Sequence, residues 1–198
     1  MTASAPDLPG DSLRFRRLMG RWATGVSVVT ARDGPRDAGL TVNALLSVST
    51  HPPALLVSLM HDVDTLPVLR RAEAFAASFL AHDQRALSER FAATVPPAEK
   101  FRGLAVHRGA TGAPLLDGTL GAIECRVRSV TPAFDHELVL GEVVRQEVGR
   151  DVLPLLFYRS GYAEADGPDG LRLPRAAPGR KGNLGRGGFK PPRTRSTR

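Results

Sequence analysis

The stretch that decides the fold is Gly39-Leu40-Thr41-Val42-Asn43-Ala44-Leu45-Leu46-Ser47-Val48-Ser49-Thr50-His51-Pro52-Pro53. Small hydroxyl and amide side chains alternate there with apolar ones over two predicted strands, near residues 38–42 and 45–50. Strands of an ordinary core carry fewer polar groups than this. The pattern fits either a solvent-facing barrel exterior or a wall that binds a polar, phosphate-bearing ligand, and both interpretations stand on spacing alone.

Four of these polar residues fall at odd-numbered positions, namely Thr41, Asn43, Ser47 and Ser49. If the two strands are neighbours, the four side chains project to the same side of the sheet. Ser58 recurs on the next apolar strand, and Asp64-Thr65 begin a predicted helix whose N-terminal amides can receive a phosphate. Pro52-Pro53 end the second strand rigidly. These neighbours favour the ligand interpretation.

Outward from this stretch, apolar runs predict further strands at residues 26–30, 54–60, 74–81, 123–128, 138–146 and 155–158. Helices are expected from Asp11 or Ser12 toward Gly25, over 64–71 and over 83–92, and the Pro- and Gly-rich residues 94–118 are expected to form irregular loop. In the strand 123–128, Glu124 belongs to the polar, outward-facing set. No long strands are joined by a regular helical crossover, so the pattern predicts a mainly β protein, an antiparallel barrel with a few short helices.

The net charge of +7 belongs to one end of the 198-residue chain. Residues 165–198 hold nine Lys or Arg and two Asp, which leaves 18 basic and 18 acidic residues in 1–164. We therefore divide the chain into a flexible N-terminus (1–11), a neutral folded domain (12–164) and a basic, disordered tail (165–198). The tail can attract nucleic acid weakly, but a solvated tail is the simpler interpretation.

Other function classes lack their motifs. There is no P-loop, GxSxG or HExxH, and Gly185-Arg186-Gly187-Gly188 follow no predicted strand. The five histidines are spread widely, so no metal site is expected. A single cysteine, Cys125, and the lack of a signal peptide or membrane-length apolar run indicate a cytoplasmic protein.

The run from Arg21 to Thr30, followed by Gly-Leu-Thr-Val-Asn, resembles the opening of the flavin reductase-like proteins, which form an FMN-binding, Greek-key split barrel. Further matches are Ala74-Phe75-Ala76, Lys100-Phe101, Asp135-His136, Gly141-Glu142-Val143 and residues 154–162. The resemblance covers about residues 12–164. It is closest to the small NAD(P)H:flavin oxidoreductases that supply reduced flavin to two-component monooxygenases.

The resemblance implies a flavin site on particular residues. The flavin ring and ribityl chain would lie against Gly39, Leu40, Thr41, Asn43 and Ala44, with Ser47 and Ser49 beyond them, and Ser58, Asp64 and Thr65 would hold the phosphate. Ala92, Ala93 and Lys100 would close over the cofactor, His136 would face the nicotinamide, and Tyr158 and Arg159 would lie near the same pocket.

The same resemblance implies hydride transfer from NADH or NADPH to FMN or FAD, with neither choice fixed by the sequence. It also implies a homodimer and a partner monooxygenase. No strong acid or base is needed, because the two nucleotides carry the chemistry. A flavin-binding electron-transfer or accessory protein without pyridine-nucleotide turnover remains the alternative, since one fold supports several functions.

Overall fold

The computed structural model describes residues 9–163. Its helices are α1 (Pro9–Met19), α2 (Thr65–Ala72), the 3-10 helix η1 (His82–Gln84), α3 (Arg85–Ala92) and α4 (Pro97–Phe101). Its strands are β1 (Thr24–Gly25), β2 (Ser27–Asp33), β3 (Arg36–Val42), β4 (Leu45–Thr50), β5 (Pro53–Met60), β6 (Ala74–Phe79), β7 (Val106–Arg108), β8 (Pro114–Leu116), β9 (Gly121–Ala133), β10 (His136–Val148), β11 (Leu156–Tyr158) and β12 (Gly161–Ala163). The expected terminal segment 165–198 and most of 1–11 lie outside the described residues.

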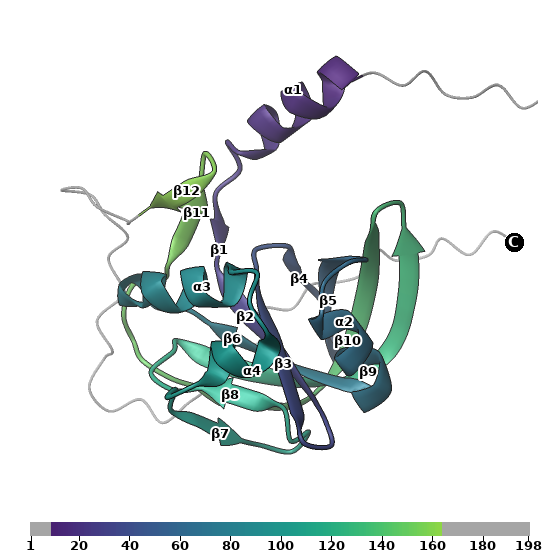
Figure 1. Cartoon of the computed structure of the whole chain (residues 1–198), viewed down its shortest axis with the longest axis vertical. Coiled ribbons are helices and arrows are strands. Elements are labelled where there is room, and N and C mark those ends of the chain that lie inside the picture. The colour runs from purple at the N-terminus through teal and green to yellow at the C-terminus, as the bar shows by residue number, and fades with distance from the viewer. Residues whose placement is uncertain (1–8, 164–198) are drawn as a thin grey trace, which may run out of the picture.

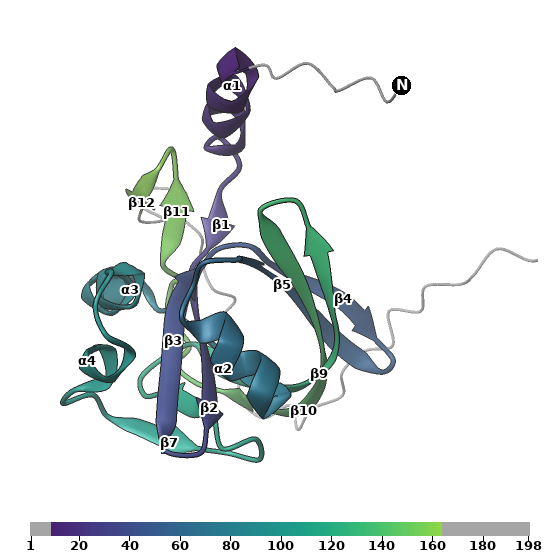
Figure 2. The same ribbon diagram turned by 45° about the vertical axis from the view of Figure 1, so that its right-hand side comes forward.

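Seven strands form one antiparallel sheet in the order β3-β2-β6-β9-β10-β5-β4. The sheet curls into a barrel that stays open between its two edge strands, β3 and β4, with α2 between them in Figure 2. The prediction of a mainly β, antiparallel split barrel is confirmed. Among residues 9–163, no helix is both long and apolar enough to cross a membrane.

The main core fills the barrel with side chains from both its halves, including the fully buried Val29, Val57, Phe75 and Val139. Helix α2 covers one side of this core with Leu66 and Leu69, which are also buried. A smaller cluster around Phe91 seats α3 against β2. Each fully buried side chain of this size contributes about 1.5–3 kcal/mol, so the barrel is a firm support for the loops at its open edge.

The expectation that the strands near residues 38–42 and 45–50 are neighbours in the sheet is wrong. Among the described strands, β3 pairs only with β2 and β4 pairs only with β5, so they lie at opposite ends of the sheet order. Each strand closes a tight hairpin with one sequence neighbour, and the short link Asn43-Ala44 carries the chain between the two edges. Ser47 and Ser49 therefore do not lie beside Thr41 in the sheet.

Two other regions differ from expectation. Residues 94–118 contain α4, β7 and β8, where irregular loop was expected. Pro97 does not prevent the helix α4, because it lies in the first turn, where a missing N–H costs nothing. The first helix ends at Met19, not near Gly25, and Trp22 beyond it is 71% exposed. Helix α1 projects away from the barrel (Figure 1).

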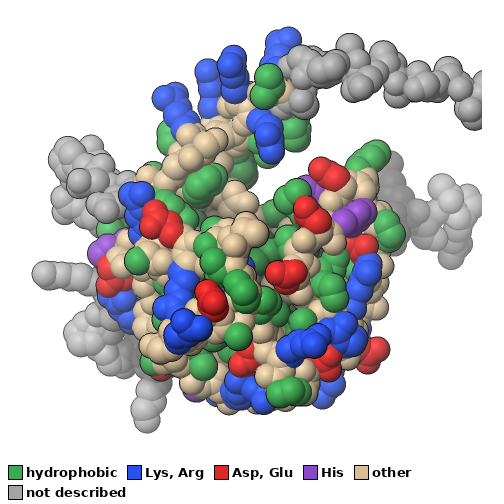
Figure 3. All heavy atoms as spheres, viewed as in Figure 1, with side chains coloured by type: hydrophobic (Ala, Val, Ile, Leu, Met, Phe, Trp, Pro, Cys, Tyr) green, Lys and Arg blue, Asp and Glu red, His purple; other side chains and the backbone are tan. Residues whose placement is uncertain are grey.

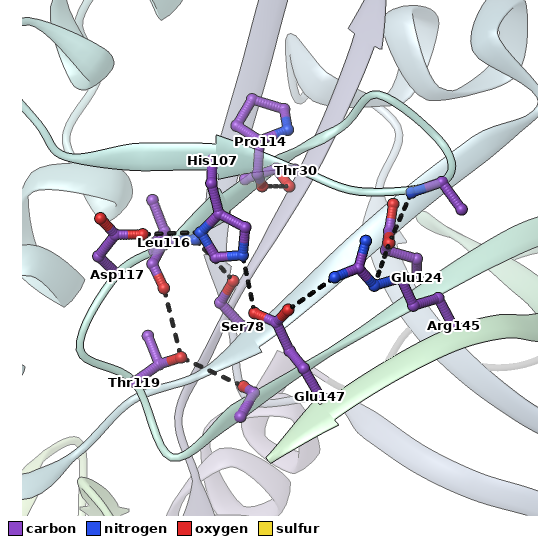
Figure 4. Close-up of polar contacts among 12 residues, drawn as sticks. Thr30, Ser78, His107, Pro114, Leu116, Asp117, Thr119, Glu124, Arg145 and Glu147 are labelled. Carbon is purple, nitrogen blue, oxygen red and sulfur yellow. Dashed lines mark hydrogen bonds and ion pairs between the residues drawn. The ribbon is translucent and has the colours of Figure 1, made fainter. Parts of the chain in front are cut away.

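A polar cluster ties the β7–β8 hairpin to the barrel (Figure 4). We call it the hairpin network: His107, Asp117, Glu124, Arg145 and Glu147. Glu124 is only 1% exposed, so its predicted outward position is wrong. The loop after β7 covers it and satisfies it: its carboxylate accepts hydrogen bonds from the backbone N–H groups of Ala110 (2.9 Å) and Thr111 (2.8 Å).

Candidate functional site

A groove of about 540 Å³ runs along the outer edge of β3, beneath α3 and α4 and beside the start of α2. It is lined by twelve of the residues that the sequence nominated: Gly39, Leu40, Thr41, Asn43, Ala44, Ser58, Asp64, Thr65, Ala92, Ala93, Lys100 and His136. Residues far apart in sequence thus meet in one place. The volume lies within the range of small-molecule sites, about 300–1,000 Å³.

The wall on the β3 side is backbone as much as side chain. Lys100 Nζ donates hydrogen bonds to the carbonyls of Gly39 (3.3 Å) and Phe91 (3.0 Å). Because Lys100 reaches Gly39 from outside the sheet, the backbone groups of Gly39 point away from β2. The same holds for Thr41, two residues on in an antiparallel strand. The unpaired edge of β3 therefore offers its N–H and C=O groups to the groove.

Gly39 and Thr41 also shape the groove from below. A Cβ at position 39 would lie 2.8 Å from Phe91 Cε1, so the glycine makes room for the buried Phe91 ring. The Thr41 hydroxyl donates to the Ser88 carbonyl at 2.6 Å, which holds the end of α3 against β3. The resemblance placed both residues against a ligand, and the structure shows that each also positions α3.

Lys100 is the cation of this groove. Its side chain is half-buried, and this burial lowers the pKa of its ammonium, although the Asp64 carboxylate acts in the opposite direction. Its two hydrogen-bonded carbonyls leave one N–H donor for a ligand. A partly desolvated ammonium that faces an open groove is well suited to a phosphate or another anion.

The start of α2 has fewer free donors than the sequence suggested. Leu66 N–H already donates to the Val63 carbonyl at 3.2 Å, and Pro67 has no N–H. Asp64 makes no capping hydrogen bond with its side chain. The backbone N–H of Ser58 donates to Ala44 at 3.0 Å, but its side chain lines the groove. Lys100 is therefore better placed than the helix end to meet an anion.

His136 begins β10 at the far end of the groove. Its Nδ1 lies 2.7 Å from the Asp135 carboxylate, which is an acceptor and so fixes the proton on Nδ1. This hydrogen bond is the main cause of a lowered pKa at Asp135. From the turn after β5, His61 Nε2 donates to the His136 carbonyl at 2.8 Å. The imidazole is thus oriented, with Nε2 left for a ligand.

A second cleft of about 900 Å³ adjoins the groove under α1. The two cavities share four residues: Asn43, Ala44, Ser58 and His136. Sequence reasoning missed the rest of this cleft, including Phe15, Leu56 and Phe157. Phe15, Leu18 and Trp22 recur at helical spacing, but this spacing does not distinguish core packing from the wall of a ligand cleft.

Four nominated residues lie outside both cavities. Ser47 and Ser49 belong to the edge strand β4, where the Ser49 hydroxyl accepts a hydrogen bond from His51 N–H at 3.2 Å. Tyr158 and Arg159 form the β11–β12 turn, with the Arg159 guanidinium 5.2 Å from the Tyr158 ring centre. Arg159 N–H donates to the Gly20 carbonyl, which fastens this turn to the chain after α1.

Comparison with known proteins places the chain among flavin reductases. Residues 19–166 match the model of the flavin reductase like domain. The chain is 36% identical over 148 residues to the reductase component of 4-hydroxyphenylacetate 3-monooxygenase from Thermus thermophilus, covering 75% of this chain and 93% of that protein. It is also 36% identical over 151 residues to a flavin reductase from Pseudomonas putida, covering 75% and 86%.

A solved structure is similar as well. The NADH:FAD oxidoreductase of Streptomyces globisporus has a TM-score of 0.75 and 29% identity, over 84% of this chain and all of that one. The family match covers most of the chain and includes every residue that lines the groove. The chain therefore belongs to the flavin reductase-like family.

Proposed function

We propose that the protein is an NAD(P)H:flavin oxidoreductase, which transfers a hydride from a reduced nicotinamide to FMN or FAD. The observation that carries this is the meeting of two nucleotide-sized cavities at Asn43, Ala44, Ser58 and His136. We assign the flavin to the groove along β3 and the nicotinamide to the cleft under α1. The two rings would then stack where the cavities join.

The residues present fit a flavin. The groove has an unpaired strand edge for the polar rim of the ring, small side chains at Ala44, Ala92 and Ala93, and one cation at Lys100. When bound, the flavin supplies the hydride acceptor, so the protein has to bind, orient and exclude water. A site without a nucleophile is consistent with this task.

Each polar residue then has a defined role. Lys100 binds the flavin phosphate, and the β3 edge near Thr41 donates to the ring. His136, oriented by Asp135, accepts a hydrogen bond at Nε2 from the N–H of the nicotinamide carboxamide and holds the nicotinamide over the flavin. Because His136 lines both cavities, it is the residue best placed to fix the distance between the two rings.

The relatives suggest where the reduced flavin goes. The Thermus thermophilus protein is named a reductase component of a monooxygenase, and a Rhizobium relative is named the reductase component of an FADH(2)-dependent resorcinol hydroxylase. We propose by this similarity that the present protein supplies reduced flavin to a partner oxygenase. Its buried, unpaired Cys125 suits a reducing compartment such as the cytoplasm.

A homodimer is also part of the proposal. Helix α1 and the residues after it expose large apolar side chains: Leu13, Phe15, Leu18, Met19 and Trp22. Figure 3 shows hydrophobic and basic side chains together on this projecting helix. An apolar face of this kind is typical of a protein interface, and a second copy that covered it would enclose the cleft under α1. Sedimentation of the purified protein tests this.

The enzymatic proposal is tested by oxidation of NADH and NADPH without oxygen, with and without added FMN or FAD. We expect oxidation that requires flavin and converts one equivalent of flavin per equivalent of nucleotide. Tight flavin binding with no oxidation of either nucleotide would overturn the proposal and favour the accessory-protein alternative.

A further inference from the structure

A third cavity continues the flavin groove toward the start of β3. It has a volume of about 680 Å³ and lies between α2 and α4. It shares Asp64 and Pro97 with the groove, so the two form one path along the strand. Helices α2 and α4 flank β3 on either side (Figure 2).

The length of this path exceeds what a mononucleotide needs. An extended strand rises about 3.3 Å per residue, so Arg36 lies about 10 Å from Gly39 and about 23 Å from Asn43 along β3. Lys100 contacts Gly39 and thus marks the place of the first phosphate. Everything from Gly39 down to Arg36 lies beyond that phosphate, on the side away from the flavin ring.

The walls of this lower cavity combine flat apolar groups with cations. Pro67, Pro96 and Phe101 provide apolar surface, and Phe101 is held edge-on to Phe91 at 5.1 Å between ring centres. A planar base buries well against surfaces of this kind.

Arg36 and Arg71 provide the positive charge of the lower cavity. Arg71 is paired with Asp33 at 2.5 Å, whereas Arg36 makes no ion pair within residues 9–163. The Asp37 carboxylate is already neutralised by Arg32 (3.3 Å) and Arg108 (2.7 Å). Arg36 is therefore available to a phosphate.

We propose that this lower cavity binds the adenosine 5′-phosphate half of FAD, so that the protein prefers FAD to FMN. The inference rests on the proposed function, because it takes the flavin ring to lie in the groove above. The adenine would pack on the proline and phenylalanine rings, and Arg36 would bind the outer phosphate while Lys100 binds the inner one. Guanidinium groups pair well with phosphate oxygens.

The test compares dissociation constants for FMN and FAD, measured by quenching of flavin fluorescence, in the wild type and in Arg36→Glu. A phosphate contact of this kind is worth about tenfold in affinity. We expect the wild type to bind FAD at least about tenfold more tightly than FMN, and Arg36→Glu to lose most of that preference while its affinity for FMN stays unchanged. AMP should compete with FAD more effectively than with FMN.

The matched control is Arg102→Glu, which makes the same charge change at the exposed residue that follows α4, outside the cavity. It should keep the wild-type preference. Equal wild-type affinities for FMN and FAD, or an equal loss of preference in both variants, would overturn the inference and leave the oxidoreductase proposal intact. Binding of neither flavin would overturn both.

Adenosine phosphate is also part of NADH, so one further measurement decides whether FAD or NADH occupies the lower cavity. With FMN as the acceptor, the KM for NADH should be the same in Arg36→Glu and in the wild type. A raised KM for NADH with no change in the FAD-to-FMN ratio would give the cavity to the pyridine nucleotide and would contradict the FAD assignment.

Discussion

The flavin groove and the hairpin network are both rich in polar side chains, and they differ in where those groups point. In the hairpin network each charged group meets another protein group: His107 lies 2.7 Å from Asp117 and 2.9 Å from Glu147. In the groove, Lys100 keeps one donor and His136 keeps its Nε2 acceptor for a ligand. Polar content alone therefore does not mark a binding site. A binding site is marked by polar groups beside a cavity that have no partner within the protein.

The largest effect we predict is on the free energy of unfolding, when the hairpin network is broken. Replacement of Glu124 by alanine leaves the N–H groups of Ala110 and Thr111 buried without an acceptor, which should cost about 3 kcal/mol of unfolding free energy. Urea unfolding measures it. The control Glu89→Ala removes only an exposed pair with Arg85 and should cost less than about 0.5 kcal/mol. Equal costs for the two variants would show that the network is not structural.

Next in size is the effect of Lys100 on ligand binding. Lys100→Met keeps the length of the side chain and removes its charge, so we expect the dissociation constants of FMN and FAD to rise about tenfold or more. Fluorescence titration measures this. If the variant binds both flavins as the wild type does, Lys100 serves only to link α4 to β3.

A comparable or smaller effect is expected at His136, on turnover and not on flavin affinity. His136→Ala removes one oriented hydrogen-bond acceptor, so flavin-dependent NADH oxidation should fall about tenfold. Because the side chain is partly exposed, the unfolding free energy should stay the same. His136→Asn, which retains an acceptor, should recover part of the rate. An unchanged rate in the alanine variant would remove His136 from the mechanism.

The smallest effect is a pH dependence within the hairpin network. The hydrogen bond with Asp117 raises the pKa of His107 above its usual 6.5, and Glu147 adds to this. The stabilisation is therefore complete below pH 6.5 and is lost as the pH rises through the higher, folded-state pKa. Since these groups are solvent-exposed, we expect less than about 1 kcal/mol.

Unfolding of His107→Asn and the wild type at pH 5.5 and pH 8.5 tests this, and the difference between the two proteins should be larger at pH 5.5. A difference that does not change with pH would mean that protonated His107 contributes nothing to the network.

The sequence was sufficient for those parts of the site that local patterns determine. The alternation over β3, the helix start at Asp64-Thr65 and the strand that follows Asp135 all lie close to where spacing put them. The antiparallel barrel also followed from the lack of helical crossovers. These features depend on residues close together in the chain.

The missed features depend on contacts between distant segments. Nothing local shows that β3 and β4 lie at opposite ends of the sheet, so Ser47 and Ser49 were expected beside Thr41. Glu124 has the spacing of an exposed residue, and only the loop at Ala110 and Thr111 makes its burial tolerable. The role of Gly39 likewise depends on Phe91, more than fifty residues away.

A crystal structure of the protein with FMN tests the central claim most directly. We predict the isoalloxazine ring against Asn43, Ala44 and Ser58, beside His136, with the phosphate within hydrogen-bond distance of Lys100 Nζ. The hairpin network should bind no ligand and keep its internal pairs. A flavin ring found in the cleft under α1 or at His107, away from β3, would contradict the account.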